Sequence, residues 1–165
     1  MQLDLGAIAK GYAADEGLRV LRERGFPVAL MAASGDIAFG DPPPGKAGWD
    51  TGVDSVNASS ETFADVLQLH NAAISTSGDT EQHVEIGGIR YSHIVNPKTE
   101  KGLTHRIGVT VIAAKGIDSD GLSTAASVIA EQNGPAAALS LIEKSGARGI
   151  VVVEAGGKWK KYEGP

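Results

Sequence analysis

Hydrophobic positions near the start of the chain repeat at the spacing of a helix. Ala14, Leu18 and Leu21 lie three or four residues apart and predict one apolar helical face within residues 7–24. Gly25 follows this run, and glycine is a common residue just past a helix end. The chain is therefore expected to open with an amphipathic helix.

Two further helices are predicted in the last third of the chain. Residues 119–131 place an apolar set on one helical face, formed by Leu122, Ala125, Ala126 and Ile129. Residues 135–144 begin with Pro135, which is favoured at the first helical position, and stop before Gly146. These signals predict two consecutive helices.

Short apolar runs bounded by turn residues predict the strands. They cover residues 28–33, 66–69, 72–76, 84–91, 107–113 and 149–154. Gly87-Gly88 is a two-residue hairpin turn in the fourth run, and residues 156–157 lead into a final strand. Residues 41–48, with three consecutive prolines, are expected to form a loop. Because strands and helices do not alternate strictly, we expect an α+β fold rather than a doubly wound sheet.

Length and composition indicate one globular domain. The chain has 165 residues, of which 42% are hydrophobic and 21% charged. These values are typical of folded proteins and argue against disorder and coiled coil. A chain of this length can bury a hydrophobic core. No internal repeat or clear linker divides it, so we expect a single domain over residues 1–165.

The charge pattern argues against a nucleic acid partner. The formal net charge is −5, and the basic cluster formed by Lys158, Lys160 and Lys161 is expected to be a solvated strand end. The chain has no cysteine, which excludes disulfides, thiolate metal sites and cysteine nucleophiles. We find neither an apolar run long enough for a bilayer nor a signal peptide.

Asp120 and Thr124 are a candidate metal-binding pair. They lie four residues apart in a predicted helix, so their side chains should share one face about one turn apart. A carboxylate and a hydroxyl are hard oxygen ligands that suit Mg²⁺, which keeps water or phosphate oxygens in its other positions. The alternative is structural, because an acid in the first turn also interacts favourably with the helix dipole. The spacing alone leaves both interpretations open.

His93 has the most informative context among the histidines. It lies in the run YSHIVNP, residues 91–97, where a predicted strand enters a turn that ends in proline. Loops held by a rigid sheet often carry functional residues, and histidine can act as a general base near neutral pH. The alternative is a histidine that only hydrogen-bonds a turn. His70, His83 and His105 have weaker contexts.

Three glycine-containing segments could bind an anion. Residues 34–36 and 76–79 follow predicted buried strands, where successive backbone amides can face a negative charge. Both are also common turn sequences. Residues 4–11 bring glycine and Lys10 to the start of the first helix, where a phosphate could bind. Their spacing is not that of a Walker motif.

Taken in their order along the chain, these segments resemble the FAD:protein FMN transferase family, also called the ApbE or thiamine-biosynthesis-lipoprotein family. The matching segments are DLGAIAKGYAAD, ASGDI, STSGD, YSHIVNP and DGLSTA, at residues 4–15, 33–37, 75–79, 91–97 and 120–125. Five motifs in the family's order make the resemblance specific, and it spans nearly the whole chain. Family members carry a substantial N-terminal portion before the first motif, whereas this chain has three residues there.

The resemblance implies a fold and an activity. The fold is α+β and related to the T-fold, with a mixed or antiparallel sheet packed with helices, and this chain would form its C-terminal part. The activity is a Mg²⁺-dependent transfer of FMN from FAD to a Ser or Thr hydroxyl of a target protein, with release of AMP. The alternatives are hydrolysis of FAD to FMN and AMP, and a truncated, non-catalytic flavin-binding domain.

The resemblance also implies roles for individual residues. Asp120, Thr124 and the backbone carbonyl of Ala7 would hold Mg²⁺, and His93 would act in the transfer step. The flavin nucleotide would lie against Lys10, Gly35, Asp36, Thr76, Ser77, Gly78 and Asp79. The expected partners are FAD and an acceptor protein, and a homo-oligomer is left open. The family implies a periplasmic or membrane-anchored location, but the chain shows no leader or lipobox cysteine, so its location stays unknown.

Overall fold

The computed structural model describes residues 3–53, 65–78, 82–155 and 158–164. The helices are α1 (Ala9–Glu23), α2 (Gly116–Asn133) and α3 (Pro135–Lys144). The main sheet contains β1 (Leu30–Ala33), β2 (Asp36–Phe39), β5 (Ala72–Gly78), β10 (Ile107–Ala113), β11 (Arg148–Ala155) and β12 (Lys158–Glu163). Three two-stranded sheets pair β3 (Trp49–Val53) with β4 (Asp65–Leu69), β6 (His83–Ile86) with β7 (Ile89–Ser92), and β8 (Val95–Asn96) with β9 (Lys101–Gly102).

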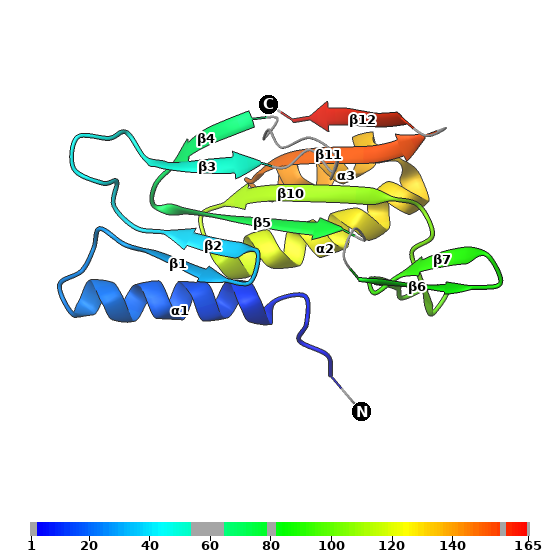
Figure 1. Cartoon of the computed structure of the whole chain (residues 1–165), viewed down its shortest axis with the longest axis horizontal. Helices are drawn as coiled ribbons and strands as arrows, with labels where there is room; N and C mark the ends of the chain where they lie inside the picture. Colours follow the sequence, from blue (N-terminus) through cyan, green and yellow to red (C-terminus); the bar gives the residue numbers. More distant parts are fainter. Residues whose placement is uncertain (1–2, 54–64, 79–81, 156–157, 165) are drawn as a thin grey trace.

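The main sheet has the strand order β1-β2-β5-β10-β11-β12, and every neighbouring pair is antiparallel (Figure 1). Together with the three helices, this sheet confirms the predicted α+β class. Strand β5 lies between β2 and β10, although both neighbours are distant from it in sequence. This order brings the β1–β2 turn and the last residues of β5 to the same end of the sheet.

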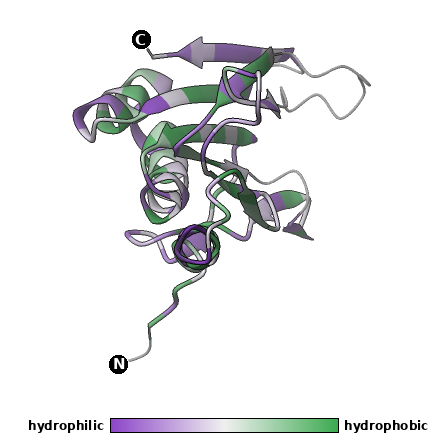
Figure 2. Ribbon diagram, turned by 90° about the vertical axis from the view of Figure 1, so that its left-hand side faces the viewer, coloured by the Kyte–Doolittle hydropathy of each residue, from purple (hydrophilic) through white to green (hydrophobic). Residues whose placement is uncertain are grey.

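The helices lie on one side of the main sheet, as the view in Figure 2 shows. Helices α2 and α3 pack on β10 and β11 around a core that includes Val111, Ile142 and Val151, each with 0% exposure. Helix α1 covers the β1–β2 edge of the sheet through Ala14 and Leu18. Two hydrophobic clusters therefore hold all three helices on the same face of the main sheet.

Helix α2 is packed on several sides, since it contacts α1, α3, β5 and β10. Small side chains make this close packing possible, and its buried residues include Ser119, Ser123, Ala126, Ser127 and Ala130. The predicted apolar face is confirmed for Ala126, while Leu122 and Ile129 are partly buried against the core. Ala125 is exposed, so its prediction was wrong. Two of the buried serines of α2, Ser119 and Ser123, form hydrogen bonds with the hydroxyls of Ser75 and Ser77 on β5.

The opposite face of the main sheet is partly covered by the β3–β4 hairpin. Phe39 and Ile74 on the sheet pack with Val53 and Leu69 on the hairpin, and Trp49 lies beside them. The sequence pattern did not predict β3, because the run WDTGV contains aspartate and glycine, which are depleted in strands. Pairing with β4 stabilises this strand despite its composition.

The structure also corrects several boundaries. The predicted polar turn at residues 34–36 is shorter, since Asp36 already begins β2, a strand that the pattern missed. Strand β5 extends to Gly78 because it keeps pairing with β10 beyond the apolar run. Strand β10 and helix α3 have the predicted bounds. No described helix is both long and apolar enough to cross a membrane.

The predicted hairpin around Gly87-Gly88 is confirmed as β6–β7. Both glycines have positive φ angles, 60° and 77°, which explains the need for glycine in this tight turn. The hairpin projects from the main body in Figure 1. Its base leads directly to His93, so the hairpin determines where that side chain lies.

Candidate functional site

Helices α1 and α2 cross so closely that their backbones touch. A Cβ atom on Gly11 would lie 2.0 Å from the Gly116 carbonyl oxygen, and one on Gly116 would lie 2.5 Å from the Gly11 carbonyl oxygen. Real Cβ contacts are not this short, so any larger residue would push the helices apart. The glycine pair therefore places the first turns of both helices within hydrogen-bonding distance.

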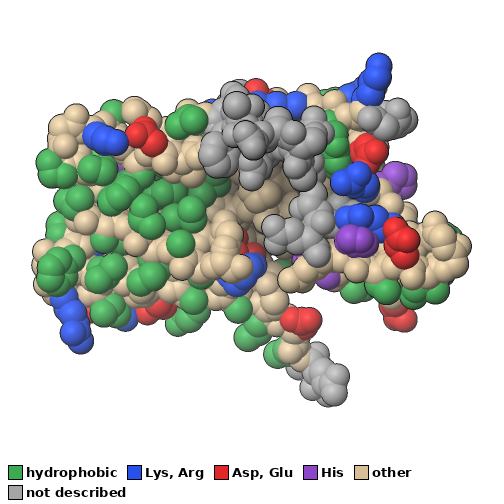
Figure 3. All heavy atoms as spheres, in the orientation of Figure 1, with side chains coloured by type: hydrophobic (Ala, Val, Ile, Leu, Met, Phe, Trp, Pro, Cys, Tyr) green, Lys and Arg blue, Asp and Glu red, His purple; other side chains and the backbone are tan. Residues whose placement is uncertain are grey.

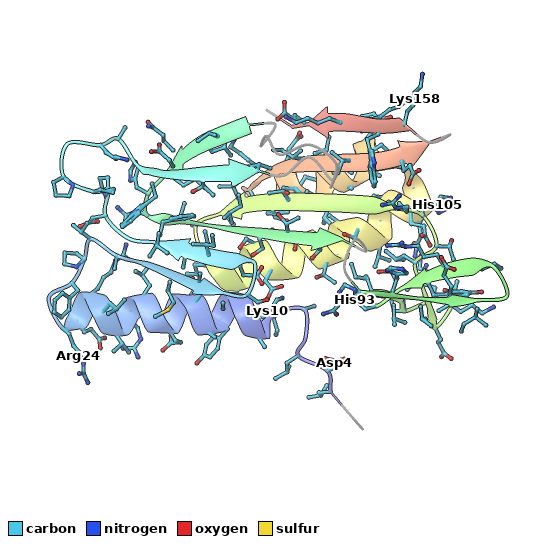
Figure 4. The ribbon with its side chains drawn as sticks, in the orientation of Figure 1. Asp4, Lys10, Arg24, His93, His105 and Lys158 are labelled. Carbon is cyan, nitrogen blue, oxygen red and sulfur yellow. The ribbon has the colours of Figure 1, made fainter. Side chains whose placement is uncertain are left out.

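Asp120 lies at this crossing and is 1% exposed. Its Oδ2 accepts a hydrogen bond from the Gly11 amide at 3.0 Å, and its Oδ1 lies 3.3 Å from the Lys10 ammonium. The same ammonium is 2.9 Å from Oδ2 of Asp36, whose side chain is 5% exposed. The structure thus joins three predicted residues from α1, β2 and α2 in one charged cluster around Lys10, which is labelled in Figure 4.

The Lys10 side chain is partly open to solvent, with 45% exposure. Burial disfavours its charge, but the hydrogen bond and charge of Asp36 and the charge of Asp120 outweigh burial and raise the pKa of Lys10 above its usual value. Lys10 is therefore a cation at neutral pH, held between two carboxylates. Its exposed portion can also approach an anion from the solvent side.

Thr124 lies one helical turn after Asp120 and faces β5. Its hydroxyl is 3.0 Å from the Ser77 hydroxyl, which is also 2.7 Å from the Ser123 hydroxyl. The Ser123 hydroxyl in turn donates to the Asp120 carbonyl at 2.9 Å. These hydrogen bonds give Ser77 a role that the sequence did not indicate, since it orients the Thr124 side chain.

The carbonyl of Ala7 faces the segment of α2 between Asp120 and Thr124. Its oxygen is 4.0 Å from the position of a Cβ atom on Gly121. None of the described residues donates a hydrogen bond to this oxygen, and the Gly11 amide, one turn further on, donates to Asp120. The Ala7 carbonyl is therefore an oxygen beside α2 that accepts no hydrogen bond from the described residues.

This donor set fits a hard divalent cation. It consists of the Asp120 carboxylate, the Thr124 hydroxyl and the Ala7 carbonyl, all oxygen donors, and such ligands suit Mg²⁺. Within the described ranges, no three His, Cys, Asp or Glu side chains gather closely enough to hold a metal ion. A cation held by this protein at the helix crossing would thus depend on hydroxyl and carbonyl oxygens as well as on Asp120.

His93 lies apart from this cluster, at the base of the β6–β7 hairpin (Figure 4). The side chain is exposed, and its Nδ1 is 3.2 Å from the Gln82 carbonyl oxygen. Because a carbonyl only accepts hydrogen bonds, Nδ1 carries the proton in this contact. In this tautomer Nε2 carries the lone pair that can accept a proton, which is the arrangement a general base needs.

In Figure 3, acidic and basic side chains lie close together in the region between the β1–β2 strands and the β6–β7 hairpin. Lys10 on α1 and His93 beyond β7 lie toward opposite sides of this region in Figure 4.

The other predicted residues are distributed around this face. Gly35 is exposed in the β1–β2 turn, next to Ser34, whose φ of 56° is unusual for a residue other than glycine. Gly78 ends β5, two residues after Thr76. The Thr76 hydroxyl bonds Thr110 at 2.9 Å and lies on the opposite sheet face from Ser77, because side chains alternate along a strand. Asp79 is outside the described residues.

Comparisons with known proteins agree on one family. The model of the ApbE family matches residues 1–149. The FAD:protein FMN transferase of Klebsiella pneumoniae (strain 342) is 28% identical over 165 residues, covering 99% of this chain and 46% of that protein. The enzyme of the same name from Treponema pallidum (strain Nichols) is 33% identical over 138 residues, covering 78% of this chain and 38% of that protein.

Solved structures show the same likeness in three dimensions. The ApbE protein of Thermotoga maritima superimposes with a TM-score of 0.85 at 32% identity, covering 97% of this chain and 51% of that one. The flavinyl transferase ApbE of Pseudomonas stutzeri, in its apo form, gives a TM-score of 0.79 at 32% identity, covering 98% of this chain and 49% of that one. This chain spans about half the length of these relatives. On the family match and the shared fold, it belongs to the ApbE family.

Proposed function

We propose that this chain carries the Mg²⁺ site of an FAD:protein FMN transferase and the histidine, His93, that activates the acceptor hydroxyl. The reaction moves FMN from FAD to a Ser or Thr hydroxyl of a target protein and releases AMP. The names of the related enzymes support the transfer of FMN to a protein. The observation that carries the proposal is the buried Asp120 carboxylate held by α1, with Thr124 one turn further along α2 and the Ala7 carbonyl next to Gly121 between them.

The reaction is a phosphoryl transfer, which depends mainly on positioning and on charge stabilisation. The acceptor oxygen bonds to the phosphorus of the FMN half, and the bond from that phosphorus to the bridging oxygen breaks. The electron pair of this bond leaves with AMP. Bound Mg²⁺ would neutralise the pyrophosphate, with Asp120, Thr124 and the Ala7 carbonyl as its protein ligands.

Residues of this chain would accept the proton of the acceptor hydroxyl and bind the phosphate and the flavin nucleotide. Nε2 of His93 takes the proton of the acceptor hydroxyl, while the contact of Nδ1 with the Gln82 carbonyl holds the ring. Lys10 presents a positive charge to a phosphate oxygen from its exposed side. The residues proposed to lie along the flavin nucleotide are Gly35, Asp36, Thr76, Ser77, Gly78 and Asp79.

The proposal is tested by incubating the chain with FAD, Mg²⁺ and the acceptor protein of a related transferase. In-gel flavin fluorescence and mass spectrometry should show a covalent FMN adduct and free AMP. Asp120→Ala and His93→Gln should abolish the adduct. The matched controls are Asp118→Ala, an exposed acid in the same helix, and His83→Gln, an exposed histidine in the same hairpin, and both should retain it.

Two results would contradict this proposal. FAD that is split to FMN and AMP without any adduct would indicate a pyrophosphatase that uses water as the acceptor. FAD that stays intact while the chain still binds it would indicate a non-catalytic flavin-binding domain. Product analysis separates these outcomes, because only the transferase links FMN to protein.

A further inference from the structure

Asp15 on α1 binds the start of α2, although it belongs to neither the proposed metal ligands nor the proposed flavin contacts. Its Oδ1 accepts a hydrogen bond from the Gly116 amide at 2.7 Å, and its Oδ2 accepts one from the Ile117 amide at 3.0 Å. The first amides of a helix have no partner within the helix and need an acceptor from elsewhere. For α2, a side chain of another helix supplies it.

The chain does not cap α2 locally. The N-cap residue is Lys115, which has extended backbone angles but makes no side-chain capping bond. Serine, threonine, aspartate and asparagine are the usual N-cap residues, because a short side chain can reach the amides just after it. Capping from α1 couples the two helices, which a local cap would not do.

Asp15 and the Gly11 amide act on α2 one turn apart. Gly11 and Asp15 are four residues apart on α1, and Gly116 and Asp120 are four residues apart on α2, so each pair shares one helical face. Asp15 holds the first residues of α2, while Gly11 holds the Asp120 carboxylate. Because each helix makes two contacts with the other, both the distance of α2 from α1 and the rotation of α2 about its axis are fixed at the proposed metal site.

We infer that Asp15 is a positioning residue for the Mg²⁺ site, acting on Asp120 through the first turn of α2. The inference rests on the proposed function, because it assumes that Asp120 binds Mg²⁺. Without Asp15 the first turn of α2 loses two hydrogen bonds to α1, and the Asp120 carboxylate is left with its contacts to the Gly11 amide and Lys10, so its position is less firmly fixed. Losing an outer partner of a metal ligand typically weakens metal binding by about 10- to 100-fold.

Isothermal titration of the chain with Mg²⁺, without FAD, measures the effect directly. Asp15→Asn should weaken Mg²⁺ binding about 10-fold, near the lower limit for outer partners, since Asp15 does not touch Asp120 itself. The matched control is Glu131→Gln. Oε2 of Glu131 also accepts two backbone hydrogen bonds, from Thr104 at 2.8 Å and His105 at 2.9 Å, but at a distant part of α2. Glu131→Gln should lower thermal stability and leave Mg²⁺ binding within 2-fold of the wild type.

A double variant separates positioning from helix capping. Lys115→Ser places a good N-cap residue at a position with suitable extended backbone angles. In the Asp15→Asn, Lys115→Ser protein, thermal stability should recover relative to Asp15→Asn alone. Mg²⁺ binding should stay weak, because the local cap does not restore the link between α1 and α2.

Each remaining outcome overturns the inference in a distinct way. If the wild type binds Mg²⁺ and Asp15→Asn binds it equally well, Asp15 has no positioning role, while the proposed function stands. If Mg²⁺ binding recovers with the local cap, or weakens equally in Glu131→Gln, Asp15 acts only through stability. If the wild type binds no Mg²⁺, the proposed function and this inference fail together.

Discussion

Gly11 and Gly116 bring the backbones of α1 and α2 into contact, and the Gly11 amide uses this proximity to bind the Asp120 carboxylate. Gly11 is buried and contributes no side chain to the site. The position of Asp120 nevertheless depends on it, because the crossing would widen around any larger residue. A glycine contact between two helices is thus the structural basis of the candidate site.

Gly11→Ala should destabilise the fold and displace Asp120. The added methyl group would meet the Gly116 carbonyl oxygen at 2.0 Å, and backbone atoms cannot move aside as a flexible side chain can. Overpacking of this kind typically costs about 1–3 kcal/mol, and we expect the upper end of this range. Urea denaturation measures the change in the free energy of unfolding.

Gly121→Ala is the matched control for this prediction. It adds the same methyl group to the same pair of helices, but at 3.4 Å from Cγ2 of Ile8, which is an ordinary contact. Alanine is favoured over glycine in a helix interior by about 0.5–1 kcal/mol, so this variant should be neutral or slightly stabilised. Equal losses in both variants would contradict the importance of the Gly11–Gly116 contact.

The elements that the sequence predicts best are those with strong local signals. Helix α3 begins at Pro135 and ends before Ser145 and Gly146, and the β6–β7 turn carries two consecutive glycines. In each case one residue type is required by the local backbone. The pattern does not predict β2, since Asp36 is interpreted as part of a polar turn and residues 37–39 are assigned to no element, and only pairing with β1 and β5 makes them a strand.

The candidate site, like the fold, was predictable from the sequence only in part. Motif order and side-chain chemistry identified Asp120, Thr124 and Lys10, and the structure brings Asp120 and Lys10 into contact. The roles of Asp15 and Ser77 were not predictable, since each depends on a partner about 50 to 100 residues away in the chain. The one available signal was their presence inside matching motifs, and a motif does not show which atoms a residue contacts.

Ser77→Ala should weaken both the fold and the proposed metal site. The change removes the partner of the Thr124 and Ser123 hydroxyls, and the loss of a buried hydrogen bond costs about 1 kcal/mol. The Thr124 hydroxyl would then be free to rotate, so Mg²⁺ binding should weaken as well. Urea denaturation and Mg²⁺ titration measure the two effects.

Ser75→Ala provides the comparison on the same strand. The Ser75 hydroxyl bonds the Ser119 hydroxyl at 2.8 Å in an equally close contact between β5 and α2, without touching Thr124. It should lower the free energy of unfolding by about the same 1 kcal/mol and leave Mg²⁺ titration unchanged. If both variants bind Mg²⁺ like the wild type, Thr124 does not depend on Ser77.

The stabilising contribution of Lys10 should be lost at high pH. Asp36 and Asp120 outweigh burial and raise the pKa of Lys10 in the folded chain, so folding favours the protonated amine. Its contribution should be fully present below the unfolded pKa of about 10.4 and should disappear as pH rises through the higher folded value. Urea denaturation of the wild type and Lys10→Met, without metal, should show a constant difference between pH 7 and about 9 that narrows above about 10. A difference that narrows below pH 9 would contradict the raised pKa.

Gly149 and Ile142 should be energetically coupled where α3 packs on β11. A Cβ atom on Gly149 would lie 2.6 Å from Cδ1 and 3.2 Å from Cγ2 of Ile142, which is completely buried. Gly149→Ala should therefore cost about 1–3 kcal/mol through overpacking. Ile142→Val removes this Cδ1 atom and should cost about 0.5–1.5 kcal/mol through the cavity it leaves.

The double variant tests this coupling, because the methyl group added at Gly149 would occupy the space left by Cδ1 of Ile142. The free energy lost by the double variant should be smaller than the sum of the two single losses by about 0.5 kcal/mol or more, as expected for residues in direct contact. Urea denaturation of the four proteins completes the cycle. If the losses of unfolding free energy in the two single variants simply add in the double variant, the two residues are not coupled. The added methyl group would then push β11 and α3 apart and would not fill the cavity left by Cδ1.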